Sequence, residues 1–360
     1  MSISEQDVAR RKPPPRRSPG LRHLSRRFGL RLSQQRELSI RRLKRGGGYG
    51  FVRADGRAIT DADTLTRLKA LAVPPAYTEV RYARSPRAHL QAVGRDAAGR
   101  LQYRYHPEWE KVRELRKARR LARLVEALPK IRRSVAQRLA ANELSREFAL
   151  SAVIELVART AIRPGNDAYA KLHGSRGATT LLKSNVTIEN DGVVLSFRAK
   201  GGKSVQKECN AQALVRAIER LHALPGKRLF QYRDEAGEVR PVTSAQVNTF
   251  LREVAGVRIS CKDFRTLLAS AAVMETLARV TPAGSARARN RQIMDAVRAS
   301  ADELANTPAI CRKSYVHETI VTAFEDGLLE RFSSKLKGCR SQARREQVLR
   351  EVVGLAAAGR

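Results

Sequence analysis

The chain reads Asn306-Thr307-Pro308-Ala309-Ile310-Cys311-Arg312-Lys313-Ser314-Tyr315-Val316-His317 near its C-terminal end. This stretch places one tyrosine beside three potential cations and nine positions after an asparagine. A phenol has a pKa near ~10 and is a poor nucleophile at neutral pH. Nearby cations stabilise the phenolate and attract phosphate, so the pattern fits a tyrosine that attacks a phosphodiester. Taken alone, the pattern is more typical of a surface or half-buried packing tyrosine.

The overall charge points to a polyanionic partner. The 360 residues include 70 Lys and Arg against 35 Asp and Glu, which gives a formal net charge of +35. Nucleic acid is the first candidate, because phosphates dominate such binding. An anionic membrane surface is the competing interpretation, but no uninterrupted apolar run is long enough to span a bilayer. Hydrophobic residues form 42% of the chain, enough for a core, and the length suggests two domains with tails.

The cysteines argue against a metal site and against a disulfide framework, because they are far apart and form no CxxC pair. They are Cys209, Cys261, Cys311 and Cys339. The basic, Pro-rich N-terminus lacks the apolar segment of a signal peptide. We therefore expect a cytoplasmic, nucleoid-associated protein that needs no metal and no other cofactor.

Composition divides the chain into four segments. Residues 1–47 are rich in Arg and are predicted to be a basic arm, either disordered or lying on DNA phosphates. Residues 48–107 contain short runs of alternating polar and apolar residues, which predict a small β-rich domain whose polar face meets either phosphates or water. Residues 108–332 are predicted to be mainly helical, and residues 333–360 to be a basic peripheral tail. The fold class is therefore α+β.

One small sheet is predicted inside the helical segment. Residues 180–208 are expected to form a three-stranded β-meander, whose first turn is Asn190-Asp191-Gly192. The second turn, Lys200-Gly201-Gly202-Lys203, places Lys200 at a hairpin tip. Apolar spacing predicts helices at 108–128, 130–146, 148–160, 243–255, from about 263 onward, 291–305 and 316–331.

Five scattered side chains supply the chemistry for cleaving a phosphodiester. Arg163 follows a predicted helix, and Arg265 lies near the start of another, where backbone amides favour an anion. Two guanidinium groups can clamp the charge that develops on the nonbridging oxygens. Lys200 can protonate the leaving 5′-oxygen, and the Asn306 amide can donate one more hydrogen bond. Tyr315 can form the covalent intermediate.

Through these residues the chain resembles the type IB DNA topoisomerases of the compact bacterial and poxvirus-like branch, over about residues 48–330. In the predicted helical segment, five separated motifs in the right order carry the resemblance. Four more motifs match in the predicted β-rich segment. The first five are Ala161-Ile162-Arg163-Pro164-Gly165-Asn166-Asp167, Gly174-Ser175 through Thr179-Thr180-Leu181, Phe197-Arg198-Ala199-Lys200-Gly201-Gly202-Lys203, Lys262-Asp263-Phe264-Arg265-Thr266, and Asn306-Thr307-Pro308 through Tyr315. The others are Ile59-Thr60-Asp61, Pro74-Pro75-Ala76, His89-Leu90-Gln91-Ala92 and Tyr103-Arg104-Tyr105-His106-Pro107.

The resemblance implies a tyrosine recombinase/topoisomerase IB-like fold, with two domains that close around duplex DNA. It implies a monomer that relaxes DNA, preferably supercoiled DNA, without ATP or metal. Tyr315 would form a 3′-phosphotyrosyl link, while Arg163 and Arg265 would hold the scissile phosphate. Lys200 would be the general acid, and Asn306 would contact a nonbridging oxygen.

Further DNA contacts are expected from basic and aromatic side chains near the motifs. The resemblance also implies that Lys262, three positions before Arg265, contacts the phosphate or the transition state. The remaining candidates are Lys203, Arg198, Lys313, Arg312, Tyr82, His89, Gln91, Tyr103 and Tyr105.

Two other functions fit parts of the sequence. A tyrosine recombinase shares the chemistry, but recombinases usually carry a histidine three positions before the second arginine, where this chain has Lys262. A noncatalytic basic DNA-binding protein would use none of the five residues catalytically. The chain also departs from the poxvirus pattern, which has histidine at the position of Asn306, and from the expected apolar residue at Pro164. His317 has no assigned role.

Overall fold

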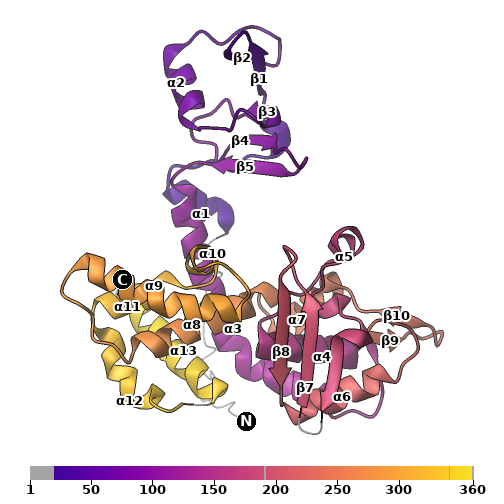
Figure 1. Ribbon diagram of the computed structural model, residues 1–360. Helices are drawn as coiled ribbons and strands as arrows, with labels where there is room; N and C mark the ends of the chain where they lie inside the picture. The colour runs from indigo at the N-terminus through magenta and orange to yellow at the C-terminus, as the bar shows by residue number, and fades with distance from the viewer. Residues whose placement is uncertain (1–19, 190–191, 340, 359–360) are drawn as a thin grey trace, which may run out of the picture. The chain divides into compact units, whose positions relative to one another are not determined.

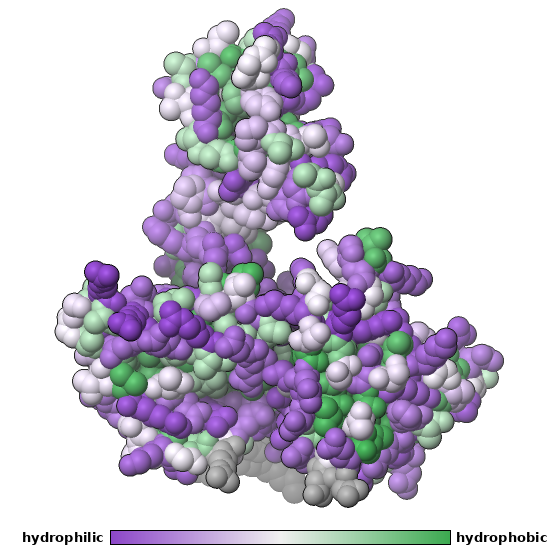
Figure 2. Space-filling view, viewed as in Figure 1, coloured by the Kyte–Doolittle hydropathy of each residue, from purple (hydrophilic) through white to green (hydrophobic). Residues whose placement is uncertain are grey.

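The computed structural model describes residues 20–189, 192–339 and 341–358. The chain divides into two compact units, with the boundary between Arg116 and Lys117 (Figure 1). Hydrophilic side chains cover most of the visible face of each unit (Figure 2). Among the described residues, no helix is both long enough and apolar enough to cross a membrane.

The first unit is built on an antiparallel five-stranded sheet with the order β2-β1-β3-β4-β5. Helix α2 (Ala62–Ala70) begins at Asp61, whose carboxylate accepts a hydrogen bond from the Thr64 amide. Leu68 of α2 is buried with Phe51 and other apolar residues of the sheet. The strands are β1 (Ile40–Arg45), β2 (Gly48–Val52), β3 (Thr78–Tyr82), β4 (Leu90–Arg95) and β5 (Leu101–Tyr105).

Residues 20–47 belong to this unit, so the prediction of a basic arm over 1–47 is wrong for them. They form α1 (Leu21–Arg27), a 3₁₀ turn at Gln35–Glu37 and strand β1, which pairs with both β2 and β3. The reason is apolar burial between the arginines: Leu24 and Leu30 pack with Trp109 and Val112. Residues 1–19 of the predicted arm lie outside the described residues.

The second unit has a helical core. The long helix α3 (Trp109–Leu139) continues through Pro129, where two separate helices were predicted. Its apolar residues stay in phase on both sides of the proline, and Leu124, Leu128 and Ile131 are buried in the main core. This burial offsets the cost of a proline inside a helix. Two further helices of this unit, α4 (Arg146–Thr160) and α8 (Cys261–Leu277), are buried along most of their length.

The predicted β-meander is confirmed as a three-stranded sheet with the order β6-β7-β8. Its strands are β6 (Val186–Glu189), β7 (Gly192–Arg198) and β8 (Ser204–Cys209). Residues 190–191 of the first predicted turn lie outside the described residues. The elements around this sheet are α5 (Asp167–His173), 3₁₀ turns at Ala178–Thr180 and Lys183–Asn185, α6 (Gln212–His222), a hairpin of β9 (Gln231–Arg233) and β10 (Val239–Pro241), and α7 (Ser244–Ala255).

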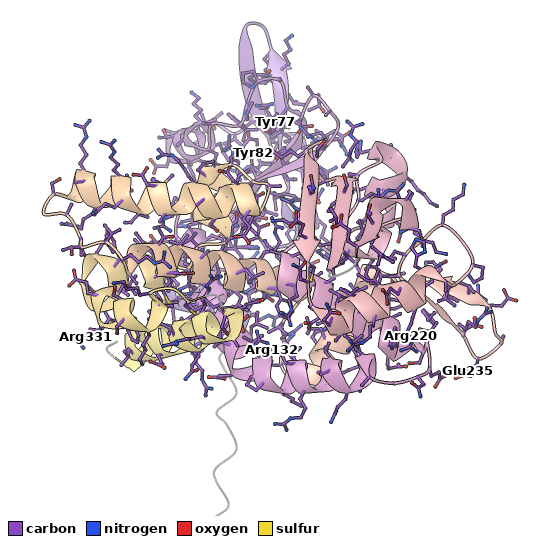
Figure 3. The ribbon with its side chains drawn as sticks, turned by 60° about the horizontal axis from the view of Figure 1, so that its bottom comes forward. Tyr77, Tyr82, Arg132, Arg220, Glu235 and Arg331 are labelled. Atoms are coloured by element: carbon purple, nitrogen blue, oxygen red, sulfur yellow. The ribbon has the colours of Figure 1, made fainter. Side chains whose placement is uncertain are left out.

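The described residues of the C-terminal part are mainly helical. It contains α9 (Ala286–Glu303), α10 (Pro308–Ser314), α11 (Glu318–Glu325), a 3₁₀ turn at Leu328–Phe332, α12 (Ser333–Leu336) and α13 (Gln342–Ala358). The prediction of a peripheral tail from residue 333 is wrong, because Val348, Leu349 and Val352 of α13 are buried in the main core. Arg132 of α3, which is labelled in Figure 3, also forms an ion pair with the buried Glu346 of α13.

Candidate active site

Tyr315 lies at the C-terminal end of α10. This short helix begins at Thr307, whose hydroxyl accepts a hydrogen bond from the Ile310 amide, and Pro308 occupies its first turn. Tyr315 is only 7% exposed. Two cations of α8 face its ring: the guanidinium carbon of Arg265 is 4.8 Å from the ring centre, and the Lys262 ammonium is 5.7 Å from it.

These cations change the acidity of the phenol. Burial raises the pKa of Tyr315, but the charge of Arg265 and its hydrogen bond to the phenol lower it. The charges of Arg163 and Lys262 lower the same pKa further. The net pKa of Tyr315 lies below its ordinary value, so the site favours the nucleophilic phenolate.

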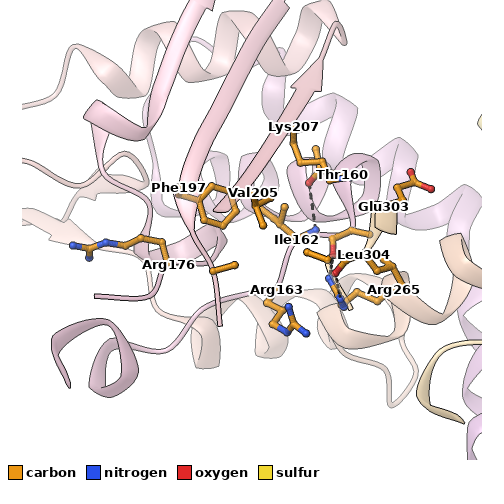
Figure 4. A pocket seen from close by; sticks show the side chains of 13 residues that line it. Thr160, Ile162, Arg163, Arg176, Phe197, Val205, Lys207, Arg265, Glu303 and Leu304 are labelled. Carbon is orange, nitrogen blue, oxygen red and sulfur yellow. Dashed lines mark hydrogen bonds between the residues drawn. The ribbon is translucent and has the colours of Figure 1, made fainter. Parts of the chain in front are cut away.

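Arg265 is buried at the junction of three segments and is only 2% exposed. One of its amino groups donates to the Ala161 carbonyl, and the other donates to the Leu304 carbonyl at 2.8 Å (Figure 4). A guanidinium has five N–H donors, so two remain after these two hydrogen bonds and the one to the Tyr315 phenol. One of them is the Nε–H, which is buried and has no hydrogen-bond partner among the described residues.

Arg163 and Asn306 are joined directly. The Arg163 Nη2 donates to the Asn306 Oδ1 at 2.7 Å. Asn306 is buried, and its Nδ2 has no hydrogen-bond partner among the described residues. An unpaired buried amide is costly unless a ligand satisfies it. The Asn306 Nδ2 is therefore available to donate to an oxygen of a bound phosphate.

The backbone that carries Arg163 is braced by the segment that precedes Leu181. The Ala178 amide donates to the Arg163 carbonyl, and the Thr179 amide donates to the Pro164 carbonyl, both at 2.8 Å. A Cβ at Gly177 would lie 2.5 Å from the Arg163 carbonyl oxygen, so only glycine fits there without movement. Pro164 is accommodated because the brace uses its carbonyl and needs no N–H from it.

Lys200 differs from the other four predicted residues. It is exposed, at the tip of the β7–β8 hairpin, where Gly201 and Gly202 both have positive φ. Its ammonium lies 5.9 Å from the ring centre of Tyr169 on α5. The structure thus brings four of the predicted residues together through hydrogen bonds and ring contacts: Arg163, Arg265, Asn306 and Tyr315. Lys200 instead contacts Tyr169, which is not one of the five.

The backbone around Tyr315 is held by residues that the sequence did not single out. Ser270 of α8 donates to the Tyr315 carbonyl and accepts from the His317 amide. Lys117 of α3 donates to the carbonyls of Lys313 and Val316. His317 now has a structural role, since its Nδ1 accepts from the Thr319 amide at the start of α11.

Two predicted DNA contacts are corrected by their burial. Tyr82 and Gln91 are each 2% exposed, so neither offers DNA a surface. Tyr82 packs in the sheet core of the first unit, edge-on to Phe51. The Gln91 amide donates to nearby backbone carbonyls, including that of Ala88, and accepts from Arg67. Alternation of polar and apolar residues does not by itself show that these two side chains are buried.

The remaining candidates have accessible side chains or side-chain partners. Tyr103 and Tyr105 are 43% and 41% exposed and stack on each other, with ring centres 6.2 Å apart. His89 packs on Trp109 and accepts a hydrogen bond from the Ser33 amide. Arg312 forms an ion pair with Glu318. Arg198, Lys203, Lys262 and Lys313 are exposed.

Side chains that bind metals do not gather in the described part of the chain. No group of three or more His, Cys, Asp or Glu residues there is placed to hold a metal ion. The four cysteines are buried free thiols.

Comparisons with known proteins cover most of the chain. The family model described as the catalytic core of eukaryotic DNA topoisomerase I matches residues 106–343. The model described as the N-terminal domain of bacterial DNA topoisomerase IB matches residues 48–96. A DNA topoisomerase 1B of Acanthamoeba polyphaga mimivirus is 29% identical over 284 residues, which are 77% of this chain and 84% of the viral protein.

Proposed function

Because the chain belongs to the type IB DNA topoisomerase family, whose catalytic core spans residues 106–343, we propose that Tyr315 is the nucleophile with which it relaxes DNA. The single observation that carries this assignment is the environment of the phenol. Tyr315 is buried against Arg265 and Lys262, with Arg163 also close enough to lower its pKa. A tyrosine packed only for stability needs no such cluster of cations.

In the proposed cleavage step, the Tyr315 Oη forms a bond to the scissile phosphorus and the bond from phosphorus to the 5′-oxygen breaks. The products are a 3′-phosphotyrosyl link and a free 5′-hydroxyl. The broken strand rotates, and the 5′-hydroxyl then attacks the phosphorus while its proton returns to the Lys200 amine. The bond from phosphorus to the Tyr315 Oη breaks, which reseals the strand and releases the tyrosine. Superhelical strain drives the rotation, so this sequence consumes no nucleotide.

The other groups stabilise the charge that develops during this exchange. Arg163 and the free N–H donors of Arg265 contact the nonbridging oxygens, which carry increased negative charge in the transition state. The Asn306 Nδ2 donates one further hydrogen bond, which satisfies the amide left unpaired in the free protein. Lys200 donates the proton that the leaving 5′-oxygen requires.

The exposed cations and aromatic residues are proposed to contact DNA. In the second unit these are Arg198, Lys203, Lys262 and Lys313, and in the first unit they are Tyr103, Tyr105 and the half-buried His89. Their number predicts a steep loss of affinity with salt, because each phosphate contact releases counterions. Arg312 contributes less, since Glu318 already neutralises it.

We further propose that a monomer acts, preferably on supercoiled DNA, on the nucleoid in the cytoplasm. Arg163, Arg265, Asn306 and Tyr315 come together through contacts within one fold, which supports action as a monomer. Sedimentation of the protein would test the monomer. Relaxation of plasmids of graded superhelical density would test the preference for supercoiled DNA. A rate proportional to the square of protein concentration would contradict the monomer.

The test of the nucleophile is to trap the covalent adduct and map the linked residue. Tyr315→Phe should abolish both the adduct and plasmid relaxation, in EDTA and without ATP, while DNA binding is kept. Tyr232→Phe is the matched control, because this tyrosine of the same unit uses its hydroxyl only to accept from Gln246. An adduct that persists in Tyr315→Phe would refute the assignment.

A further inference from the structure

The carbonyl of Tyr315 is bound by a serine on the helix that carries the two facing cations. Ser270 is fully buried on α8, and its hydroxyl donates to the Tyr315 carbonyl at 3.2 Å. The Ser270 Oγ also accepts a hydrogen bond from the His317 amide at 3.1 Å. One hydroxyl therefore fixes the backbone immediately before and after Val316.

The same turn is held from another helix. The Lys117 ammonium of α3 donates to the Lys313 carbonyl at 3.2 Å and to the Val316 carbonyl at 3.1 Å. The last carbonyls of a helix lack partners within the helix, and a cation there also meets the negative end of its dipole. Lys117 thus satisfies the C-terminal end of α10, where the nucleophile lies.

We propose that Ser270 and Lys117 are positioning residues that hold the Tyr315 backbone, so that its phenol stays against Arg265. This inference rests on the proposed role of Tyr315 as nucleophile. Ser270 lies five residues after Arg265 on α8, which is about 7.5 Å along one rigid helix. Helix α8 therefore holds both the backbone of the proposed nucleophile, through Ser270, and the Arg265 guanidinium that faces the phenol. Both positioning residues form hydrogen bonds with backbone groups, so they would affect the reaction only through the position of Tyr315.

Ser270→Ala removes both hydrogen bonds and is the first test. We expect single-turnover cleavage to slow by about 10- to 100-fold, because small displacements of reacting groups have effects of this size. The rate should fall equally on a normal phosphodiester and on a 5′-bridging phosphorothiolate, since proton donation to the leaving group is not affected. The pH profile should move to higher pH, because a phenol displaced from Arg265 regains a higher pKa. The dissociation constant for DNA should not change.

Conservative variants separate positioning from simple stability. Ser270→Thr keeps the hydroxyl and should restore most of the rate. Lys117→Arg keeps the cation and should cleave faster than Lys117→Met, which removes it. Ser300→Ala is the control, because this buried serine of α9 contacts the Cys311 thiol of α10 and not the Tyr315 backbone. It should leave both the rate and the pH profile unchanged.

Two results would overturn the inference: wild-type cleavage by Ser270→Ala, or equal slowing by Ser300→Ala without a change in pH profile. If the Ser270 variants do not fold, Lys117→Met decides through the same three readouts, and an unchanged rate and pH profile would then refute the proposal. Failure of the nucleophile assignment is distinguishable, because it appears as an adduct in Tyr315→Phe.

Discussion

Tyr315 and Lys200 have contrasting surroundings, although both are assigned to one reaction. Tyr315 is buried, ends a helix and has its backbone held by Ser270 and Lys117. Lys200 is exposed in a turn beside two glycines of positive φ, with its ammonium near the Tyr169 ring. The proposed nucleophile and phosphate-binding residues are thus packed together, whereas the proposed proton donor lies on a hairpin tip.

The two halves of the proposed reaction would therefore depend on different parts of the structure. In the proposal, activation of the phenol depends on a packed framework of α8, α10 and the Arg163 segment. Protonation of the leaving group would depend on where a short turn places one lysine. Substitutions can therefore affect one half without the other, and bridging phosphorothiolate substrates distinguish the two cases.

Arg265→Ala should have the largest effect, because it removes both a phosphate ligand and the main charge that lowers the pKa of Tyr315. We expect cleavage at neutral pH to slow by about 1,000-fold or more on either substrate. Without Arg265 the pKa of Tyr315 rises, so the remaining activity should increase toward higher pH than in the wild type. Single-turnover cleavage across a pH series measures both effects. An unshifted profile would contradict the role of Arg265 in activating the phenol.

Lys200→Ala should slow cleavage of a normal phosphodiester by about 100-fold, a typical contribution of a general acid. A 5′-bridging phosphorothiolate has a leaving group that needs no proton, so its cleavage should change little. Lys203→Ala, in the same turn, is the control and should weaken DNA binding without this substrate dependence. Equal slowing of Lys200→Ala on both substrates would remove the general-acid assignment and with it the contrast between the two regions.

A pair of glycine substitutions compares the framework and the tip directly. Gly177→Ala places a Cβ 2.5 Å from the Arg163 carbonyl oxygen and should cost about 1–3 kcal/mol of unfolding free energy. It should also slow cleavage of both substrates by about tenfold through displacement of Arg163. Gly201→Ala meets nothing within 4 Å and strains only its own backbone, at about 1 kcal/mol. Urea unfolding and cleavage rates measure the pair. A Gly201→Ala variant that slows cleavage of both substrates as much as Gly177→Ala would contradict the difference between the two regions.

Glu346→Gln should have the smallest effect and tests how far the framework depends on α13. Burial raises the pKa of Glu346, although the charge of Arg132 opposes this. A carboxyl with a raised folded-state pKa stabilises the fold less as pH rises through that pKa. The amide should therefore change the unfolding free energy by no more than about 1 kcal/mol at pH 7, and its relative stability should improve from pH 5 to pH 8. A loss above about 3 kcal/mol would show that the ion pair is strongly stabilising.

The sequence indicated candidate residues for the site but not the groups that support them. Charge, residue type and motif order singled out five candidates, whose roles stay predictions, and hairpin signals placed Lys200 correctly at a turn. The pattern of alternation did not reveal that Tyr82 and Gln91 are buried. Ser270 gave no signal, because one serine within an apolar helix has no partner that a linear sequence specifies. Arginine density likewise concealed the apolar residues that order residues 20–47 and α13.

The two hydrogen bonds from Arg265 to the Ala161 and Leu304 carbonyls have a consequence for the protein in a cell. They tie the end of α4 and the end of α9 to α8, so a change at Arg265 also weakens the fold. Destabilised proteins are cleared by proteases, and differences of about 1–2 kcal/mol alter abundance several-fold. We expect Arg265 variants to be scarce as well as slow, while Lys200 variants accumulate at normal levels as folded protein that occupies DNA without relaxing it.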